Sequence, residues 1–592
     1  MQMSGLGFIQ FTGIFREELR LMDFRNIVSR FASVVIILFS LAACAISPTT
    51  IPSAAPSNTA TVVPPTAIPA NPVPAVTNTT ASVFPMGTNG MPWWNDTVFY
   101  EIFVRSFYDS NGDGKGDFKG LTAKLDYLKD LGISGLWLMP INPSPSYHGY
   151  DVTDYYGVNP DYGTMDDFKN FISEAHKRGI RVVIDFVLNH TSDQNPWFKA
   201  STDPTSKYRN WYIWSDTDPG YLGPWGEEVW HENLGGGYYY GIFTAQMPDL
   251  NYQNPDVTQE MEKVTQFWLK DIGLDGFRLD AAQHLIEDGK TQANTPATHD
   301  WFKQFRTFYK SVNPQAMTIG EVASTSYSVA SYVNNGDQLD LAFDFDQAQS
   351  WVNGVLAGDA KKLMNSTDFE HNIFPKEQIA TFLTNHDQNR AMSQLGDDVN
   401  KAKAAATILL TAPGVPFIYY GEEIGMDGKK PDEKIRTPMQ WSADNFTGFT
   451  TGTPWEIQNA DYKVKNVAIE SKDPNSLLSH YKQLIQIRNQ HPALRVGDLI
   501  KLDTANSSIY AVLRTAGDET ILTLINLSNQ PVSDYKINFS GSTLKGTYQV
   551  QALFGSGTFA PTVVNDSGGV DSYQPIAQIP ANANLVLILN QK

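Results

Sequence analysis

The sequence has one cysteine, few basic residues and no long apolar run. Cys44 stands alone among 592 residues, which excludes an intramolecular disulfide and a cysteine cluster around a metal. Lysine and arginine number 44 against 63 acidic residues, and the formal net charge of -19 argues against nucleic acid or another polyanion as a partner. The apolar run 31–43 is shorter than the roughly 20 residues that a membrane-spanning helix needs. A neutral partner therefore fits the composition best.

The N-terminal apolar run has the form of a secretory signal. Arg25 and Arg30 precede it, and its length suits the apolar core of such a signal. It ends at residues 41–44 in Leu-Ala-Ala-Cys, which resembles the bacterial lipoprotein signal, where the cysteine is lipidated and becomes the mature N-terminus. The alternative is an ordinary signal peptide with an incidental cysteine. We expect residues 1–44 to be a lipoprotein signal and Cys44 to anchor the protein outside the cytoplasm on the bacterial cell membrane.

Residues 45–90 are rich in Pro, Thr and Ala and almost free of charge. Such a segment cannot bury enough apolar surface to offset its chain entropy, so it predicts a disordered linker. The rest of the chain is long enough for two or three domains with a sizeable core. Aromatic residues make up 12% of the chain, and their flat faces with polar edges suit sugars as well as cores.

Short apolar runs alternate with amphipathic segments from residue 98 onward. This alternation predicts a (β/α)8 barrel over residues 91–494, because strands and helices that take turns build a parallel sheet. Helices are expected over 121–131, 165–178, 257–273 and 477–488. Strands are expected over 98–104, 133–139, 180–188, 276–279, 317–320, 339–345, 379–384 and 415–419.

Two further segments depart from the barrel pattern. Residues 191–252 follow the third strand and are too long for a plain connection, which predicts an inserted domain. Beyond residue 495 the apolar period changes to two, and this predicts an antiparallel β-sandwich over 495–592.

Charged and polar residues follow several of the predicted strands, and such residues point into the active-site face of a barrel. These strand ends supply His190, Arg278, Asp280, Glu321, His386 and Asp387. Single charged residues there are often solvated caps, and Arg278 with Asp280 alone would be an ordinary structural pair. Three carboxylates and two histidines at one mouth are hard to explain as caps. Arg278 should keep Asp280 ionised, as a nucleophile requires.

Motifs at these strand ends resemble those of the α-amylase family of glycoside hydrolases (family 13), over most of the chain from about residue 93. They are DFVLNH at 185–190, GFRLDAAQH at 276–284, GEV at 320–322 and TNHD at 384–387, with MPDLN at 247–251. The resemblance implies Asp280 as nucleophile, Glu321 as acid/base and Asp387 as stabiliser of the transition state.

The same resemblance assigns binding residues and names the two extra domains. It implies that His190, Arg278 and His386 hold the sugar and the carboxylates, and that Tyr150 stacks on the sugar ring at the cleavage point. Residues 191–252 would be domain B, one wall of the cleft, and residues 495–592 domain C. Retaining glycosidases place a nucleophile and an acid across the glycosidic bond, and Asp280 and Asp387 would raise the pKa of Glu321 and keep it protonated.

Two calcium sites are expected. Residues 109–117 space oxygen ligands at alternate positions with glycine sixth, as in the start of an EF-hand loop, although Gly120 replaces the glutamate at the twelfth position. The alternative is a solvated Asp/Gly turn. This loop offers Asp109, Asn111, Asp113, Lys115 and Asp117. By resemblance, a second Ca²⁺ would bind Asn189, Asp249 and the carbonyl of His284, with a fourth ligand from domain B.

The sequence most resembles an intermediate group of bacterial lipoprotein α-amylases, between oligo-1,6-glucosidases and neopullulanases. Ala281 follows the nucleophile where α-1,6-specific relatives tend to carry valine, which favours α-1,4 chains, whereas residues 436–441 (RTPMQW) are shared with glucosidases and trehalose synthases. Gln283 replaces a lysine common in α-amylases. We expect a monomeric, retaining, endo-acting α-amylase on starch or maltodextrins. The alternatives are an exo-acting α-glucosidase or oligo-1,6-glucosidase, a trehalose synthase, or a starch-binding lipoprotein without catalysis.

Overall fold

The computed structural model describes residues 87–592. The expected signal, Cys44 and nearly all of the linker lie outside the described residues. Within residues 87–592, no helix has both the length and the apolar character to cross a membrane.

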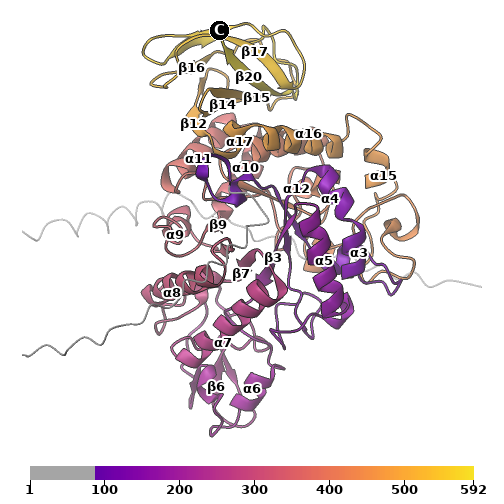
Figure 1. Ribbon diagram of the computed structural model, residues 1–592, viewed down its shortest axis with the longest axis vertical. Helices are drawn as coiled ribbons and strands as arrows, with labels where there is room; N and C mark the ends of the chain where they lie inside the picture. Colours follow the sequence, from indigo (N-terminus) through magenta and orange to yellow (C-terminus); the bar gives the residue numbers. More distant parts are fainter. Residues whose placement is uncertain (1–86) are drawn as a thin grey trace, which may run out of the picture. The chain divides into compact units, whose positions relative to one another are not determined.

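Eight parallel strands form a closed barrel, in the order β1-β11-β10-β9-β8-β7-β3-β2 (Figure 1). All eight predicted strands are present, so the predicted (β/α)8 barrel is confirmed. Their bounds are Phe99–Ile102 (β1), Gly135–Leu138 (β2), Arg181–Phe186 (β3), Gly276–Leu279 (β7), Met317–Glu321 (β8), Leu341–Phe343 (β9), Ala380–Thr381 (β10) and Val415–Tyr419 (β11).

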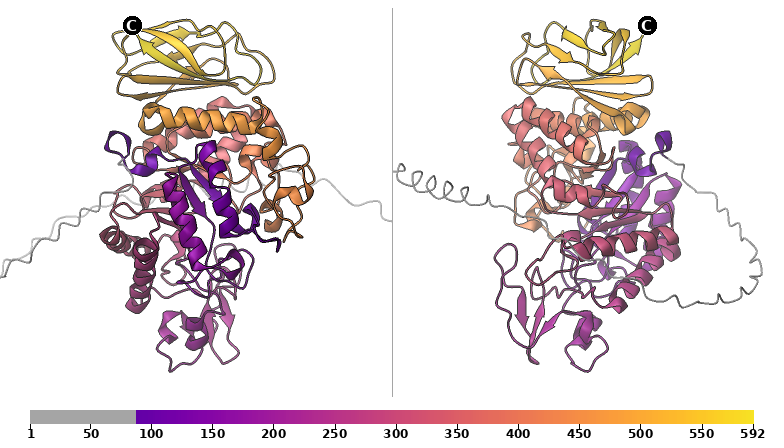
Figure 2. Two further views of the ribbon diagram at one scale, coloured as in Figure 1. Left: turned by 45° about the vertical axis from the view of Figure 1, so that its right-hand side comes forward. Right: turned by 90° about the vertical axis from the view of Figure 1, so that its left-hand side faces the viewer.

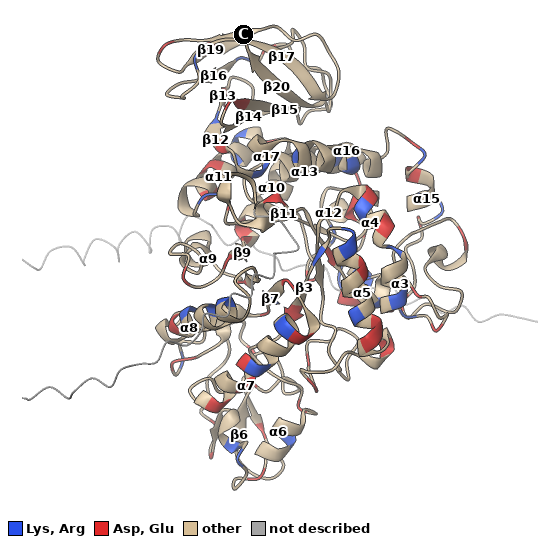
Figure 3. Ribbon diagram, in the orientation of Figure 1, with Lys and Arg blue, Asp and Glu red and all other residues tan. Residues whose placement is uncertain are grey.

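The barrel strands are buried on both faces, which explains their continuous apolar sequence. Side chains such as Phe99, Phe343 and Phe417 fill the interior, and the rings of Phe99 and Phe417 stack with centroids 4.5 Å apart. Outward-facing side chains join the cluster beneath the helices. Acidic and basic residues alternate along the outer helices (Figure 3), as in the ion pair of Lys177 with Glu174 on α5.

The helices that follow the strands cover the barrel. Their bounds are α2 Val104–Phe107, α3 Phe118–Ala123, α4 Leu125–Leu131, α5 Met165–Lys177, α7 Pro255–Gln266, α8 Pro296–Val312, α9 Ser326–Ser331, α10 Phe345–Ala357, α11 Ala360–Ile373, α12 Ala391–Gln394, α13 Val399–Thr411, α14 Asp432–Ile435, α15 Val467–Glu470, α16 Leu477–Gln490 and α17 Pro492–Val496.

Two helix predictions need correction. The expected helix over 121–131 is two helices, α3 and α4, that meet at Lys124. The ammonium of Lys124 lies 3.9 Å from the ring centre of Tyr108 and 4.1 Å from that of Trp441, so tertiary contacts override helix propensity there. The helix expected over 257–273 ends as α7 at Gln266 and continues as a π-helical turn, Phe267–Ile272.

The insertion after β3 contains α6 (Pro196–Ser201) and a small antiparallel sheet of β4 (Trp214–Ser215), β6 (Tyr238–Tyr240) and β5 (Trp230–Glu232). Its core is a small cluster around Val229, Tyr240 and Ile242. At its two ends, His190 pairs with Asp249 in an isolated bridge, and the N–H of Leu250 donates to the carbonyl oxygen of Asn189 at 2.9 Å. The insertion thus folds back onto the chain where it left the barrel.

The C-terminal region forms two antiparallel sheets, as predicted from the period-two pattern. The larger has the order β12-β14-β15-β20-β17-β18 and the smaller β13-β16-β19. The strands are β12 Asp498–Lys501, β13 Asp503–Thr504, β14 Ile509–Ala516, β15 Glu519–Asn526, β16 Ile537–Phe539, β17 Gly546–Phe554, β18 Thr562–Val564, β19 Val570–Tyr573 and β20 Asn584–Gln591. A separate apolar cluster fills the space between them.

Buried polar contacts join these sheets to the barrel. Arg514 on β14 pairs with Glu377 at 2.7 Å, and both side chains are fully buried. Helices α13 and α16 lie between the barrel strands and the larger sheet (Figure 2).

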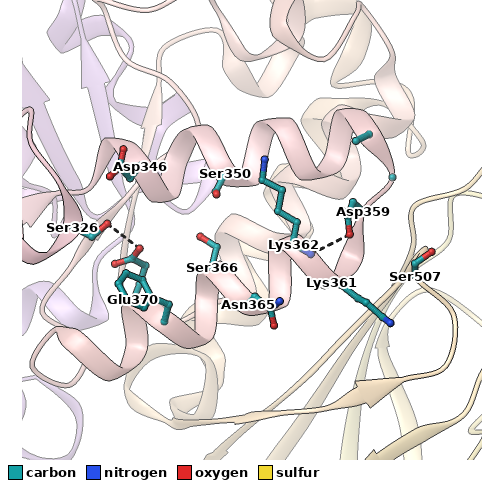
Figure 4. Close-up of a pocket in the computed structure, with 13 residues that line it drawn as sticks. Ser326, Asp346, Ser350, Asp359, Lys361, Lys362, Asn365, Ser366, Glu370 and Ser507 are labelled. Atoms are coloured by element: carbon teal, nitrogen blue, oxygen red, sulfur yellow. Dashed lines mark hydrogen bonds between the residues drawn. The ribbon is translucent and has the colours of Figure 1, made fainter. Parts of the chain in front are cut away.

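A groove of about 980 Å³ runs between α10 and α11 and reaches Ser507 (Figure 4), whose carbonyl oxygen accepts the N–H of Ala360 at 2.8 Å.

Candidate active site

A pocket of about 360 Å³ lies at the carboxyl ends of the barrel strands. Five predicted site residues line it, namely Tyr150, His190, Asp280, Glu321 and Asp387. The other two, Arg278 and His386, lie beneath these and contact them. The pocket is also lined by His148, Phe243, Thr244, Met247, Asp432 and Arg436. The structure therefore brings together every catalytic and sugar-binding residue expected from the sequence.

Arg278 is the buried centre of the site, with 1% of its side chain exposed. Its Nη1 atom lies 2.6 Å from Asp280 Oδ1 and 2.8 Å from Asp185 Oδ1. Its Nη2 atom lies 2.7 Å from Glu321 Oε2. One guanidinium thus holds the two carboxyl groups expected to react, through its rigid fork of donors.

The local backbone makes this arrangement possible. A Cβ atom at Gly276 would lie 2.1 Å from the carbonyl oxygen of Met317, so only glycine lets β7 approach β8 this closely. Directly after Asp280, Ala281 has a left-handed backbone (φ 47°, ψ 36°), and its N–H donates to Glu321 Oε2 at 3.1 Å. Strained backbone of this kind is typical of functional sites. It ties the end of β7 to the end of β8.

Burial controls the protonation of the two carboxyl groups. Burial raises the pKa of Asp280 to about 6, even though Arg278 opposes the shift. Arg278 lowers the pKa of Asp280, as expected, but does not outweigh burial, and a carboxyl with this pKa is still ionised in about nine molecules of ten at pH 7. Burial also raises the pKa of Glu321, with Asp280 and Asp387 adding to the shift and Arg278 opposing it.

Asp387 is held as an anion by the cations around it. Burial alone would raise the pKa of Asp387, but His386, Arg436 and Arg278 together hold it well below its usual range. Arg436 Nη2 lies 2.8 Å from Asp387 Oδ1, and His386 Nε2 lies 3.3 Å from Oδ2. The pKa values of Asp280 and Glu321 are thus raised while that of Asp387 is lowered, because their surroundings differ.

Tyr150 and His190 face the same pocket with different partners. The hydroxyl of Tyr150 lies 2.6 Å from His386 Nε2 and donates to Asp185 Oδ2 at 3.0 Å. Its ring stacks on that of His386, with centroids 5.6 Å apart. Burial lowers the pKa of His190 to about 3, so its imidazole is neutral, and its Nε2 atom has no hydrogen-bond partner among the described residues. That nitrogen is free for a ligand in the pocket.

Sequence reasoning gave no role to several residues of the site. Asp185 begins the DFVLNH motif and Arg436 begins the RTPMQW motif, but neither residue was assigned a contact in the site. Glu101 lies on β1 and contacts His386 at 2.5 Å. The strand-end rule could not find Glu101, because the strand expected over 98–104 has Glu101 at its middle, whereas β1 ends at Ile102.

The loop of residues 109–117 satisfies its own acceptors. Asp109 accepts from the N–H groups of Asn111, Gly112 and Gly114 at 2.7–2.9 Å, and Asp117 caps α3 through the N–H of Gly120. The ammonium of Lys115 pairs with Asp161, so only its carbonyl oxygen could bind a cation. No side-chain oxygen of this loop is buried without a donor. The loop has no unmet need for a cation, and calcium there stays a prediction.

The second set of expected calcium ligands contains buried oxygen atoms that lack a hydrogen-bond donor. Asn189 Oδ1, Asp249 Oδ2 and Glu287 Oε1 are buried and have no donor. Asp249 and Glu287 contact each other, and burial together with Glu287 raises the pKa of Asp249 well above its usual value, while burial raises that of Glu287 to about 8. Carboxylate and amide oxygens without donors fit Ca²⁺. Glu287, three residues after His284, was missed, because a fourth ligand was expected from domain B.

Backbone oxygens would have to complete this site. Among residues 87–592, no three His, Cys, Asp or Glu side chains are grouped to hold a metal. The carbonyl oxygen of His284 is the predicted backbone ligand, and its ring Nδ1 is bound to the carbonyl of Gln292 at 2.7 Å, which fixes the residue in place.

The chain is similar to known proteins over most of its length. Residues 101–497 match the family model of the α-amylase catalytic domain. Alpha-amylase 3 of Dictyoglomus thermophilum is 42% identical over 444 residues, which cover 74% of this chain and 86% of the relative. The oligo-1,6-glucosidase of Parageobacillus thermoglucosidasius is 35% identical over 74% of this chain and 91% of its own length. The trehalose synthase/amylase TreS of Mycolicibacterium smegmatis is 35% identical over 76% and 86%, respectively.

A solved structure agrees with these similarities. The crystal structure of an alpha-amylase from H. orenii superposes with a TM-score of 0.72 at 39% identity, and the match covers 83% of this chain and 99% of that one.

Removal of calcium should lower the melting temperature of the protein by a few degrees, because a cation that binds only the folded state stabilises it. We expect Glu287→Gln to abolish most of this difference, measured by calorimetry with calcium and with a chelator. Asp113→Asn, in the loop of residues 109–117, is the matched control. It should leave intact the part of the melting-temperature difference that depends on Glu287. A melting temperature that chelation does not change would contradict both calcium sites.

Proposed function

The chain belongs to the α-amylase family of glycoside hydrolases, and we propose that it is a retaining, endo-acting α-amylase that hydrolyses α-1,4-glucosidic bonds of starch and maltodextrins. One observation carries the proposal: Asp280 and Glu321 bind opposite nitrogens of the Arg278 guanidinium at the barrel mouth. This places a nucleophile and an acid side by side, with Asp387 lining the same pocket. A starch-binding protein without catalysis would not need that geometry.

The geometry supports a two-step reaction. Asp280 attacks the anomeric carbon while Glu321, protonated because burial and its anionic neighbours raise its pKa, gives a proton to the leaving oxygen. The glycosyl ester on Asp280 is then hydrolysed by water, from which Glu321 takes the proton back. The anionic Asp387 stabilises the positive charge that develops on the sugar ring.

Arg278 serves both steps without reacting. It attracts the negative charge of Asp280 before attack and holds Glu321 in place through the other nitrogen. His190 Nδ1 accepts from the side-chain amide of Asn189 at 3.4 Å, so the neutral ring carries its proton on Nε2, which can donate a hydrogen bond to a sugar hydroxyl. The ring of Tyr150, which stacks on those of His386 and His148, lines the pocket and can contact the sugar ring.

Two observations bear on the bond that is cleaved. Ala281 places little bulk beside Asp280, which suits an α-1,4 chain, and the D. thermophilum relative is an α-amylase.

A second candidate is an exo-acting glucosidase or a trehalose synthase. It is favoured by Arg436, the first residue of the RTPMQW motif, because this arginine lines the pocket and binds Asp387.

Calcium is part of the proposal. Asn189, Asp249, Glu287 and the carbonyl of His284 would hold one Ca²⁺, and this ion would join the insertion to the ends of β3 and β7. The loop with Asp109, Asn111, Asp113, Lys115 and Asp117 would hold the other. Neither ion takes part in a step of the reaction.

We also propose that the enzyme acts outside the cytoplasm as a monomer on a lipid anchor at Cys44, a proposal that rests on the sequence alone. Globomycin should block maturation of the expressed protein, and Cys44→Ser should abolish incorporation of radiolabelled lipid. A mature protein that carries no lipid would overturn the anchor. It would leave the proposed reaction untouched.

Asp280→Asn and Glu321→Gln should each lower turnover of maltodextrins by about 10³-fold or more, because each removes a group that acts in the transition state. The melting temperature should stay close to that of the wild type. Asp346→Asn, a carboxyl on α10 outside the pocket, is the control and should keep full turnover. Near-normal hydrolysis by either active-site variant would refute the assigned roles.

Products from maltoheptaose should distinguish the candidate activities. An endo-acting amylase should release a mixture of shorter maltodextrins at early times, measured by chromatography. Glucose alone as the first product would instead show the glucosidase, and conversion of maltose to trehalose would show the synthase. Ala281→Val should shift the preference toward α-1,6 bonds, with hydrolysis of isomaltose as the measure.

A further inference from the structure

His386 is buried between two anions. Its Nδ1 atom lies 2.5 Å from Glu101 Oε1, and its Nε2 atom lies 3.3 Å from Asp387 Oδ2. His386 is 0% exposed and Glu101 2% exposed, so neither can exchange this contact for water. The pair joins β1 to the loop after β10, 285 residues apart in the sequence.

The hydrogen bonds around His386 decide its protonation. An ionised Glu101 can only accept, so Nδ1 must carry a proton. The hydroxyl of Tyr150 donates to Asp185 Oδ2 and therefore accepts from Nε2, which lies 2.6 Å away. A neutral ring with a bare Nε2 would also face Asp387 Oδ2, lone pair against lone pair. The ring is satisfied only as an imidazolium with both nitrogens protonated.

We propose that Glu101 is a positioning residue that keeps His386 doubly protonated and thereby fixes the direction of the hydrogen bonds from His386 to Tyr150 and from Tyr150 to Asp185. It does not touch the substrate. The inference deepens the proposed function, because Asp185 shares Arg278 with Asp280 and so links Glu101 to the reacting group. Asp387 and Glu101 raise the pKa of His386 to about 10, against the opposing effect of burial.

Among the described residues, no other ionisable group near the His386 ring could supply the negative charge that Glu101 places at Nδ1. Tyr150 and Asp185 lie on the side of β2 and β3, and Arg278 reaches in from β7. Arg436 donates through Nε to the carbonyl of His386, and Tyr419 on β11 donates to the carbonyl of Ile435. The two arginines are cations and favour a neutral ring. Without Glu101, Asp387 would be the only anion in contact with the imidazole.

Glu101→Gln tests the inference because it keeps an acceptor for Nδ1 and removes the charge. If the pKa of His386 falls to the ordinary value of about 6.5, about one ring in thirty stays protonated at pH 8. We therefore expect kcat/KM to fall about 30-fold relative to wild type at pH 8 and less than about twofold at pH 6. Glu101→Asp keeps the charge and should show no such dependence on pH.

A second readout does not depend on hydrolysis. In protein labelled with ¹⁵N-histidine, the His386 ring, assigned by comparison with His386→Gln, should be an imidazolium at pH 8 in the wild type and neutral in Glu101→Gln. Glu423→Gln is the matched control, since Glu423 is a fully buried barrel glutamate that binds the hydroxyls of Tyr100 and Tyr127 instead.

Three results would overturn the inference: a neutral His386 ring in the wild type at pH 8, an equal loss of activity at pH 6 and pH 8 in Glu101→Gln, or the same pH dependence in Glu423→Gln. If the protein hydrolysed no glucan at all, the proposed function would fail, while the ¹⁵N spectra would still decide the role of Glu101.

Discussion

The site depends on one buried cation, the guanidinium of Arg278. Burying a charge is costly unless it is paired, and Arg278 meets three carboxyl groups, from Asp185, Asp280 and Glu321. Those carboxyl groups are themselves buried, so each depends on Arg278 in return. This mutual dependence explains why the carboxyl groups of Asp280 and Glu321 hold their positions.

Closure of the barrel turns short sequence motifs into this geometry. Eight parallel strands bring their carboxyl ends to a single mouth, so residues far apart in the chain meet there. For that reason the strand pattern and the strand-end residues were enough to predict the fold and to place His190, Asp280, Glu321 and Asp387 at one mouth, whereas Tyr150 was placed only by the resemblance to α-amylases. The helix that breaks at Lys124 could not be predicted in this way, because its cause is a contact with Trp441, more than 300 residues later.

What the sequence could not supply was the extent of burial and the identity of long-range partners. The pKa of Asp280 rises rather than falls because burial outweighs Arg278, and only the structure shows how completely the carboxyl is enclosed. Glu287 was missed because it follows the motif that ends at His284 and has no pattern of its own. Glu101 was missed because nothing in the sequence around this strand indicates its partner, His386, which lies 285 residues away.

Glu101 and Arg278 belong to one continuous line of buried hydrogen bonds. From Glu101 it passes through His386, Tyr150 and Asp185 to Arg278 and ends at Asp280. Loss of the proton on His386 Nε2 would turn the Tyr150 hydroxyl toward that nitrogen and take its hydrogen bond away from Asp185, so few members of this line can change without disturbing their neighbours. Where relatives share this line of hydrogen bonds, differences in which glucosidic bond they cleave must therefore arise from residues beside the line. Ala281, beside Asp280, and Asp432, at the pocket wall, are such residues, since neither is a member of this line of hydrogen bonds.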